Sequence, residues 1–192
     1  MDLVERGAPP LALIEEALSG DFKVHGDLAK ADCVIGFSFG YRREHSQVFP
    51  GLSNEDLANV ALKYYNEIPK ILQFEIADAY GAAGGHKEQI AKRITKHRQA
   101  GSYLDTHEVA AQAKLYMAQR KWRQALLLAH PHHLPRVDAV CRMLGMQTIV
   151  TEHTRGAVEF DLKSAQKWTR SLKAWCEYEP EAIELYRLRG WL

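Results

Sequence analysis

The chain has 192 residues, of which 46% are hydrophobic and 26% are charged, a composition typical of a single globular domain. Lys and Arg number 25 and Asp and Glu number 24, so the net charge is +1, which argues against nucleic-acid binding through bulk electrostatics. The three cysteines, Cys33, Cys141 and Cys176, lie far apart and form no C-x-x-C pair. This pattern indicates a reduced, cytoplasmic protein rather than a disulfide framework.

No targeting or membrane segment is expected. Residues 1–6 lack the cationic and apolar layout of a signal peptide. No apolar run approaches the roughly 20 residues that a membrane-spanning helix needs. We therefore expect a soluble, intracellular protein.

Apolar runs predict buried β-strands over residues 33–39, 70–77 and 125–129, with a shorter fourth over 148–150. Continuous apolar runs are typical of parallel strands that are covered on both faces.

Apolar residues at three- and four-residue spacing predict helices between the strands, over residues 57–64, 90–94, 109–117 and 137–144. Ser53 and Asp56 could form a capping box before the first of them, and Pro135 and Gly145 suit the start and the end of the last. Strands that alternate with helices predict one domain over residues 1–192. We expect a three-layer α/β/α Rossmann-like fold with a mostly parallel sheet.

The two ends of the chain are harder to assign. Residues 1–30 are interpreted as a helix over 11–18, after Pro9 and Pro10, followed by a short edge strand over 22–25. Near the C-terminus, the aromatic and apolar spacing predicts two amphipathic helices, over residues 168–175 and 183–188, separated by Glu179 and Pro180. We expect them to pack on the flank of the sheet with their aromatic residues in the core. A ligand-binding box or the face of a homodimer is the alternative.

Ligands of open parallel sheets bind beyond the carboxyl ends of the strands, where helix N-termini supply N–H groups. The loop after the first predicted strand places Ser38 and Gly40 there, so that the backbone could approach an anionic ligand while Arg42 or Arg43 pairs with its charge. The alternative is a tight turn with solvated arginines. The loop does not match a nucleotide-binding motif.

The stretch after the second predicted strand contains Gly84, Gly85 and Glu88. Glycine leaves backbone N–H groups uncovered, so the pair could cradle an anion ahead of a helix. The alternative is that the glycines only shape a turn and that Glu88 favours the first helical turn through the dipole.

Asp105 and Glu108 have the spacing of a capping box at the start of the next predicted helix. This pairing explains both residues without a ligand, while the hydroxyl of Thr106 between them could still contact one.

Three histidines, His130, His132 and His133, directly follow the third predicted strand. Imidazole is a common zinc ligand, but this spacing matches no recognised zinc pattern, so we expect no metal and keep metal-dependent hydrolysis as an alternative. His133 and Arg136 lie one helical turn apart and could hold an oxyanion, with His133 as general acid or base. The remaining alternative is a polar loop that caps the helix.

Several of these motifs occur in a familiar order. Ala31 and Asp32 enter the first strand, a glycine pair follows the second, Thr106-x-Glu108 opens a helix, and the third strand runs into His133-x-x-Arg136 and a helix that ends at Leu144-Gly145. From residue 31 to the end, this order resembles the YdcF-like family of bacterial proteins.

The resemblance implies a Rossmann-like fold with a polar pocket at the strand ends. It also implies a link to envelope or carbohydrate metabolism, as in some members, and S-adenosylmethionine as a ligand, as in one member. The pocket implied by the resemblance is lined by Ser38, Gly40, Gly84, Gly85, Glu88, Thr106, Glu108, His133 and Arg136. This chain departs from the family at Val109, where the family has Asn, and in the lower glycine content of the loop after the first strand.

Together, these features predict an enzyme, a transferase or a hydrolase, that acts on an anionic nucleotide-, sugar-phosphate- or S-adenosylmethionine-type ligand. A non-catalytic binding or regulatory module that uses the same pocket is the alternative. We expect catalytic roles for His133, Glu108 and Glu88. We expect ligand contacts from Ser38, Gly40, Arg42, Gly84, Gly85, Thr106, His130 and Arg136.

Overall fold

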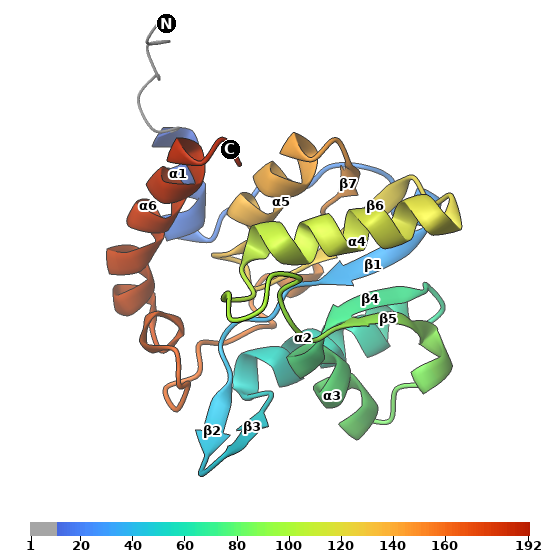
Figure 1. The fold of residues 1–192 in the computed structure, drawn as a ribbon, viewed down its shortest axis with the longest axis horizontal. Helices are drawn as coiled ribbons and strands as arrows, with labels where there is room; N and C mark the ends of the chain where they lie inside the picture. Colours follow the sequence, from blue (N-terminus) through green and yellow to red (C-terminus); the bar gives the residue numbers. More distant parts are fainter. Residues whose placement is uncertain (1–10) are drawn as a thin grey trace, which may run out of the picture.

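The computed structural model describes residues 11–192 (Figure 1). Residues 1–6, where no signal peptide is expected, and Pro9 and Pro10, before the first predicted helix, lie outside the described residues. The centre of the molecule is a five-stranded sheet in the order β5-β4-β1-β6-β7, and every neighbouring pair is parallel. The strands are β1 (Cys33–Gly36), β4 (Lys70–Gln73), β5 (Ile90–Ile94), β6 (Gln124–Leu128) and β7 (Gln147–Ile149).

Helices cover both faces of this sheet. The helices α2 (Leu52–Tyr65) and α3 (Phe74–Ala82) pack on one face, and α4 (Thr106–Arg120) and α5 (Leu134–Met143) pack on the other (Figure 1). In β1, Ile35 belongs to the core beneath α4 and α5, whereas Val34 belongs to the core beneath α2 and α3. Successive side chains of a strand point to opposite faces, so a strand covered twice has to be apolar throughout. The expected three-layer α/β/α fold is confirmed.

The N-terminal helix α1 (Leu11–Ser19) and the C-terminal helix α6 (Leu172–Leu188) lie side by side at the flank, next to α5 (Figure 1). The helix predicted near the N-terminus is therefore confirmed. The predicted edge strand over 22–25 amounts to a single antiparallel bridge between His25 and Val150.

The prediction of two C-terminal helices is wrong, because α6 is one helix that runs through Pro180. Proline removes one backbone N–H donor from the helix interior. Trp175 and Glu179 before the proline and Ile183 after it are all buried. Tertiary packing on one face therefore keeps the helix continuous.

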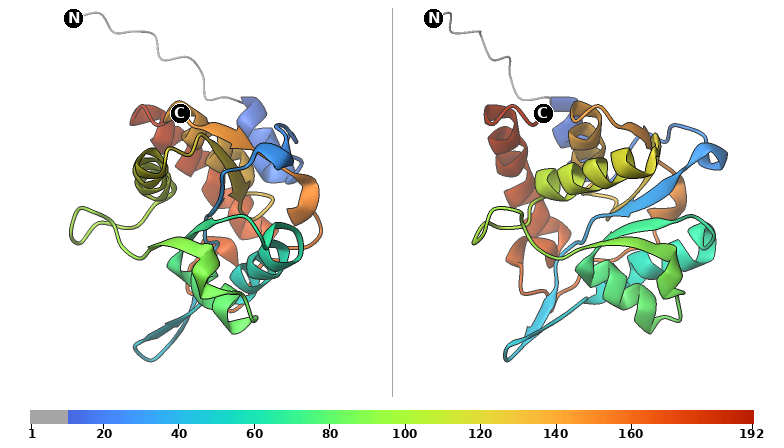
Figure 2. Two further views of the ribbon diagram at one scale, coloured as in Figure 1. Left: turned by 90° about the vertical axis from the view of Figure 1, so that its right-hand side faces the viewer. Right: turned by 45° about the vertical axis from the view of Figure 1, so that its right-hand side comes forward.

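A hairpin between β1 and α2 is a feature that the sequence did not predict. Its strands β2 (Arg42–Glu44) and β3 (Gln47–Phe49) pair in antiparallel fashion. Figure 2 shows the hairpin projecting away from the body of the molecule. The hairpin lies outside the central sheet, and most of its residues are exposed.

Two predictions around the second strand are wrong. The apolar run over 70–77 is only half strand, because β4 ends at Gln73 and α3 begins at Phe74. Residues 90–94 form the edge strand β5 instead of a helix. Ile90 and Ile94 are four residues apart, which fits a helical face as well as a short strand, and the pairing of β5 with β4 decides the outcome.

The capping box predicted for α2 is absent. The N-cap residue is Gly51 and makes no side-chain cap. Ser53 donates from Oγ to the carbonyl oxygen of Glu159 at 2.6 Å, and the carboxylate of Asp56 accepts from the backbone N–H of Glu159 at 3.1 Å. Both side chains therefore attach a distant segment to α2.

In the described part of the chain, four short 3-10 turns complete the fold: η1 (Leu28–Lys30), η2 (Lys87–Gln89), η3 (Glu152–Thr154) and η4 (Lys167–Thr169). Within residues 11–192, none of the helices combines the length and apolar character needed to cross a membrane.

Candidate functional site

The strand order creates a crevice at the carboxyl edge of the sheet. From β1 the chain moves to β4 on one side, and it later crosses over to β6 on the other side. Loops diverge at such a switch point, and ligands of open α/β sheets bind there. A pocket of about 710 Å³ opens at this edge, a size typical of small-molecule sites. Its walls come from the loop after β1, the loop before α4, the start of α5 and the region around α6.

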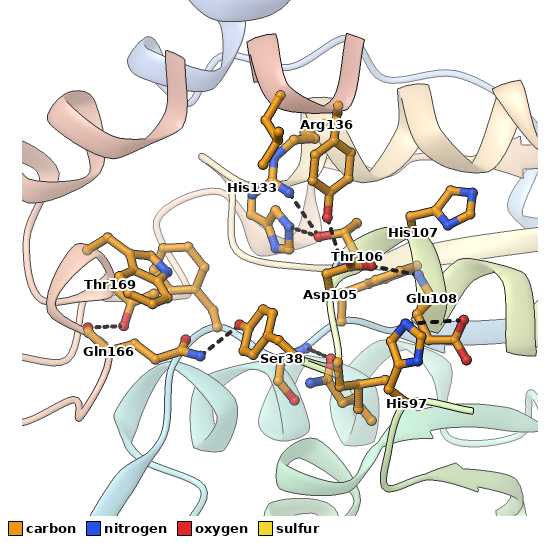
Figure 3. A pocket seen from close by; sticks show the side chains of 18 of the residues that line it. Ser38, His97, Asp105, Thr106, His107, Glu108, His133, Arg136, Gln166 and Thr169 are labelled. Carbon is orange, nitrogen blue, oxygen red and sulfur yellow. Dashed lines mark hydrogen bonds and ion pairs between the residues drawn. The ribbon is translucent and has the colours of Figure 1, made fainter. Parts of the chain in front are cut away.

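Three pocket-lining side chains meet at the hydroxyl of Thr106 (Figure 3). Thr106 is the first residue of α4, and its Oγ1 lies 3.0 Å from His133 Nε2 and 3.0 Å from an NH1 group of Arg136. His133 and Arg136 come from the start of α5, after β6. The parallel sheet brings the starts of the two helices together, although the residues are about thirty positions apart.

One hydrogen-bond direction in this cluster is fixed, and the other depends on the tautomer of His133. Arg136 can only donate, so the Thr106 oxygen accepts from it. The Thr106 hydroxyl donates to His133 Nε2 in the tautomer whose proton is on Nδ1. Burial, and then the charge of Arg136, holds the pKa of His133 well below its ordinary value. His133 is therefore a neutral imidazole, and in the tautomer with its proton on Nδ1 the Nε2 atom can accept a proton.

Arg136 is held by a buried ion pair with α6. Its Nε and NH2 groups donate to the two carboxylate oxygens of Glu179 at 2.6 and 2.9 Å. Burial opposes the charge, but the carboxylate keeps the pKa of Arg136 above its ordinary value. The two groups are 5% and 0% exposed, so the charge of the guanidinium is largely compensated within the protein. Two of its five N–H groups remain without an acceptor among the described residues.

Glu108 organises the loop that leads into α4. Its carboxylate binds the guanidinium of Arg98 at 2.7 and 3.0 Å and the backbone N–H of the same residue at 3.0 Å. The bond to the Arg98 side chain lowers the pKa of Glu108 to about 2. Asp105 caps α4 by accepting from the N–H of Glu108 at 2.9 Å. Half of the expected capping box is therefore present, and the Glu108 side chain holds the loop instead of the other half.

A second polar cluster lies behind Ser38 on the opposite wall. Ser38 donates from Oγ to Glu75 at 2.7 Å and from its backbone N–H to the side chain of Gln73 at 3.1 Å. Glu75 stands in the first turn of α3 and is 5% exposed. Burial raises its pKa to about 7. Ser38 and Gln73 line the pocket, whereas Glu75 lies behind them.

Gly40 allows the loop after β1 to pass close to the C-terminal region. Its φ is +75°, and a Cβ atom there would collide with the hydroxyl groups of Thr169 and Ser164. A residue with a side chain would be strained in backbone and in packing.

Six of the expected site residues line the pocket, namely Ser38, Gly40, Thr106, Glu108, His133 and Arg136. The other five do not: Arg42, Gly84, Gly85, Glu88 and His130.

The glycine pair and Glu88 lie at the opposite edge of the sheet, so the expectation that they join the site is corrected. They follow helix α3 and precede strand β5, instead of following a strand and preceding a helix. The loop before a parallel strand lies at its amino end, away from the carboxyl edge. Gly84 has a φ of +90° and Gly85 packs against the ring of Tyr80, so both glycines serve the turn.

Arg42 belongs to the projecting hairpin and is committed to another partner. Its guanidinium binds the Asp161 carboxylate through two hydrogen bonds of 2.7 and 2.9 Å. The same carboxylate accepts from the backbone N–H of Leu52 at 3.1 Å. This side chain therefore fastens the hairpin to the C-terminal region.

The three histidines after β6 do not point to one common centre. His130 is buried and stacks on Phe39 with 3.9 Å between ring centroids, while His132 Nδ1 lies 3.0 Å from the carbonyl oxygen of Ala17. His133 faces Thr106 as described. Across residues 11–192, no cluster of three or more His, Cys, Asp or Glu side chains is arranged to hold a metal ion.

Aromatic residues form one wall of the pocket. Trp168 and Trp175 were expected in the core, with a ligand-binding box as the alternative, and both line the pocket together with Tyr178, Tyr186 and Trp191. Trp175 is 1% exposed, so it also belongs to the core. No local pattern shows that α6 reaches the carboxyl edge, because that depends on how α6 packs against α5.

A comparison of the chain with protein-family models, with curated proteins and with solved structures finds no match. The resemblance to the YdcF-like family therefore stays a prediction, and the site is defined by its geometry.

Proposed function

We propose that the protein binds an anionic small molecule in the carboxyl-edge pocket and acts on it as a transferase or a hydrolase. The observation that carries the proposal is the meeting of Thr106, His133 and Arg136 on the wall of a pocket of about 710 Å³. A hydroxyl, a neutral imidazole and a guanidinium in mutual contact are the groups that proton transfer and oxyanion binding require.

The ligand class is a nucleotide, a sugar phosphate or an S-adenosylmethionine-type molecule. Aromatic rings such as Trp168 and Trp191 suit a planar or sugar ring. The two unused N–H groups of Arg136 suit a phosphoryl or carboxylate oxygen. S-adenosylmethionine enters only through the resemblance to the YdcF-like family.

In the proposed reaction, His133 Nε2 accepts a proton from a hydroxyl group, either that of Thr106 or one supplied by the ligand or water. Arg136 stabilises negative charge that develops on the oxygen. Glu108 acts through Arg98 by holding the loop in place, and Glu88 has no role because it lies at the other edge.

We also propose a cytoplasmic location. All three cysteines are free, and Cys33 and Cys141 are buried away from solvent, which fits a reducing compartment.

The test is a thermal-shift screen with nucleotides, sugar phosphates and S-adenosylmethionine, followed by mass spectrometry of the products. A ligand at a hundred times its Kd stabilises a protein by about 2.7 kcal/mol. His133→Ala is expected to reduce turnover about 10²- to 10⁴-fold, while His86→Ala, an exposed histidine outside the pocket, leaves it unchanged. Failure of all three ligand classes to stabilise the protein contradicts the proposal.

The second candidate is a non-catalytic binding module. It is favoured by the internal compensation of the pocket's charges, since Arg136 is paired with Glu179 and Glu108 with Arg98. Stabilisation by a ligand without any product, in wild type and His133→Ala alike, would favour this module over the enzyme.

A further inference from the structure

Three buried ring nitrogens gather around one aromatic side chain of the pocket. The ring of Phe39 stacks on His130 and has its centroid 4.9 Å from that of Trp175 and 6.1 Å from that of His133. His130 Nε2, His133 Nδ1 and Trp175 Nε1 are all buried and have no hydrogen-bond partner among the described residues. Buried polar atoms without a partner are uncommon in folded proteins, and three of the four in the described chain belong to this cluster.

Two of these nitrogens are donors, and the third is a donor in one tautomer of its ring. An indole nitrogen always carries a proton. His133 carries its proton on Nδ1 in the tautomer whose Nε2 accepts from Thr106. His130 Nδ1 accepts from the backbone N–H of His132 at 3.3 Å, which leaves the proton of the neutral ring on Nε2. With His133 in that tautomer, the cluster lacks an acceptor and not a donor.

Two of these donors belong to residues that line the pocket. His133 and Trp175 are 6% and 1% exposed, and their rings meet edge to face with centroids 5.8 Å apart. Arg136 adds positive charge at this place, with its guanidinium carbon 6.0 Å from the centroid of the Trp175 ring. The carboxylate that pairs with Arg136, that of Glu179, already has both oxygens bound to it.

We propose that the Nδ1–H of His133 and the Nε1–H of Trp175 bind an anionic oxygen of the ligand, from a phosphoryl or a carboxylate group, beside the ring of Phe39. This inference rests on the proposed function and deepens it, because it assigns the charged end of the ligand to the base of the pocket. It also gives Trp175 a binding role, whereas its helical spacing alone indicates core packing.

The geometry orients the ligand. With its charged group bound to His133 and Trp175, the rest of the molecule extends toward the outer rings of the pocket, including Trp191, which stacks on His107 with 4.2 Å between centroids. A ligand that loses its anionic group loses the hydrogen bonds at the base while it keeps the ring contacts.

The test uses the indole N–H signals of the ¹⁵N-labelled full chain. The four tryptophans give four such signals, each assigned with its Trp→Phe variant. Addition of inorganic phosphate, or of acetate in a parallel titration, is expected to move the Trp175 signal downfield, because a new hydrogen bond deshields the proton. The two titrations distinguish a phosphoryl site from a carboxylate site.

The binding constant provides the second measurement. Trp175→Phe keeps an aromatic ring but removes the donor, and a hydrogen bond to a charged group is worth about 1.5–3 kcal/mol, so binding of the better anion is expected to weaken at least about tenfold. Trp122→Phe, a half-buried residue that does not line the pocket, is the matched control and leaves binding unchanged. Should Trp175→Phe fail to fold, the variants of the other three tryptophans assign the Trp175 signal by elimination, and the titration of the wild-type protein still decides.

The inference and the proposed function fail in different ways. If nucleotides or sugar phosphates move the signals of Trp168 and Trp191 but leave that of Trp175 in place, the pocket binds ligands and the anion site assigned here is wrong. If neither phosphate nor acetate moves the Trp175 signal, the inference is likewise overturned. The proposed function is then tested separately by the thermal-shift screen with the larger ligands.

Discussion

Two glutamates at the site, Glu75 and Glu108, show how the surroundings of a carboxyl group decide whether it is ionised. Glu75 lies behind Ser38 and forms no ion pair with the residues that the structure describes, and burial raises its pKa to about 7. Glu108 is bound by the guanidinium of Arg98, which lowers its pKa to about 2. A buried carboxyl without a positive partner is stabilised as the neutral acid, and one with such a partner as the anion. Near pH 7 the pocket therefore has a permanent carboxylate on one wall and a titrating one behind the other.

Glu75→Gln is expected to change how stability depends on pH. An unfolded glutamate ionises near pH 4.5, so between pH 4.5 and about 7 the folded protein binds a proton that the unfolded chain does not. Wild-type stability from this group is complete below pH 4.5 and is lost as pH rises to about 7. The variant lacks this loss, which amounts to about 3 kcal/mol at most.

Urea denaturation at pH 4.5, 6 and 7.5 measures this effect. Glu88→Gln, at an exposed position outside the pocket, is the control and should follow the wild type. A constant difference in the free energy of unfolding between Glu75→Gln and the wild type over this range would contradict the assignment.

Among the elements, α6 does the most to complete the site. It supplies part of the aromatic wall and, through Glu179, holds Arg136 at the start of α5. The helix does this although Pro180 interrupts its backbone hydrogen bonding. The energy of packing Trp175 and Ile183 on one continuous face exceeds the energy lost at the proline.

Replacing Pro180 by Ala is expected to stabilise the protein. A proline in a helix interior is about 3 kcal/mol less favourable than alanine. Alanine restores the backbone N–H of residue 180 and with it part of this difference, so we expect a gain in stability of about 1–3 kcal/mol. The matched control is Pro135→Ala, since Pro135 stands in the first turn of α5, where the missing N–H costs little. The free energy of unfolding in urea is the measurement, and a loss on Pro180→Ala would show that the packing of α6 needs the proline.

The contact between α5 and α6 depends on the buried ion pair. Glu179→Ala leaves a buried guanidinium without its partner, and the expected loss is about 3–5 kcal/mol. The double variant Arg136→Met and Glu179→Leu removes both charges and is expected to recover most of this stability.

An exposed ion pair is the comparison. Asp78 and Arg93 are 43% and 46% exposed, so Asp78→Ala should cost less than about 1 kcal/mol. Equal losses from Glu179→Ala and Asp78→Ala in denaturant unfolding would mean that burial of the pair does not matter.

At the scale of the whole molecule, the buried histidines govern the response to acid. Burial lowers the pKa of His130 and His133 well below the ordinary value of 6.5. Below pH 6.5 the unfolded chain takes up protons at these positions while the folded protein does not, so stability is complete above pH 6.5 and falls as the pH falls. Each histidine contributes about 1.4 kcal/mol per pH unit. Two histidines outweigh the opposite effect of Glu75, so the protein is expected to be less stable at pH 5 than at pH 6.5.

The histidine prediction is measured as the difference between unfolding free energies at pH 6.5 and pH 5. His130→Gln should reduce this difference, whatever its effect at pH 6.5. His86→Gln replaces an exposed histidine and should leave the difference unchanged. An unaltered difference in His130→Gln would show that this imidazole is protonated in the folded state.

Local sequence was enough for the parts of the site that follow a strand directly. Ser38 and Gly40 come just after β1, and His133 and Arg136 come just after β6, so the rule for parallel strands places all four at one edge. The same rule fails for Gly84 and Gly85, because the preceding apolar run turns into α3 at Phe74. An error in the predicted end of one strand therefore assigns the following loop to the wrong end of the strands.

By itself, the sequence determined the fold class, since continuous apolar runs separated by helical spacing are typical of a parallel sheet covered on both faces. It also determined the loops that carry Thr106, His133 and Arg136. Only the tertiary structure decided that Glu179 neutralises Arg136, that Glu75 lies behind Ser38 and that Trp175 and its neighbours form the remaining wall. These contacts join residues 37 to 43 positions apart, or elements that no periodicity connects. The contacts of α6 depend on which face of that helix turns toward α1 and the start of α5, and the contact of Glu75 depends on where α3 begins after β4. Both are settled by the packing of the whole core.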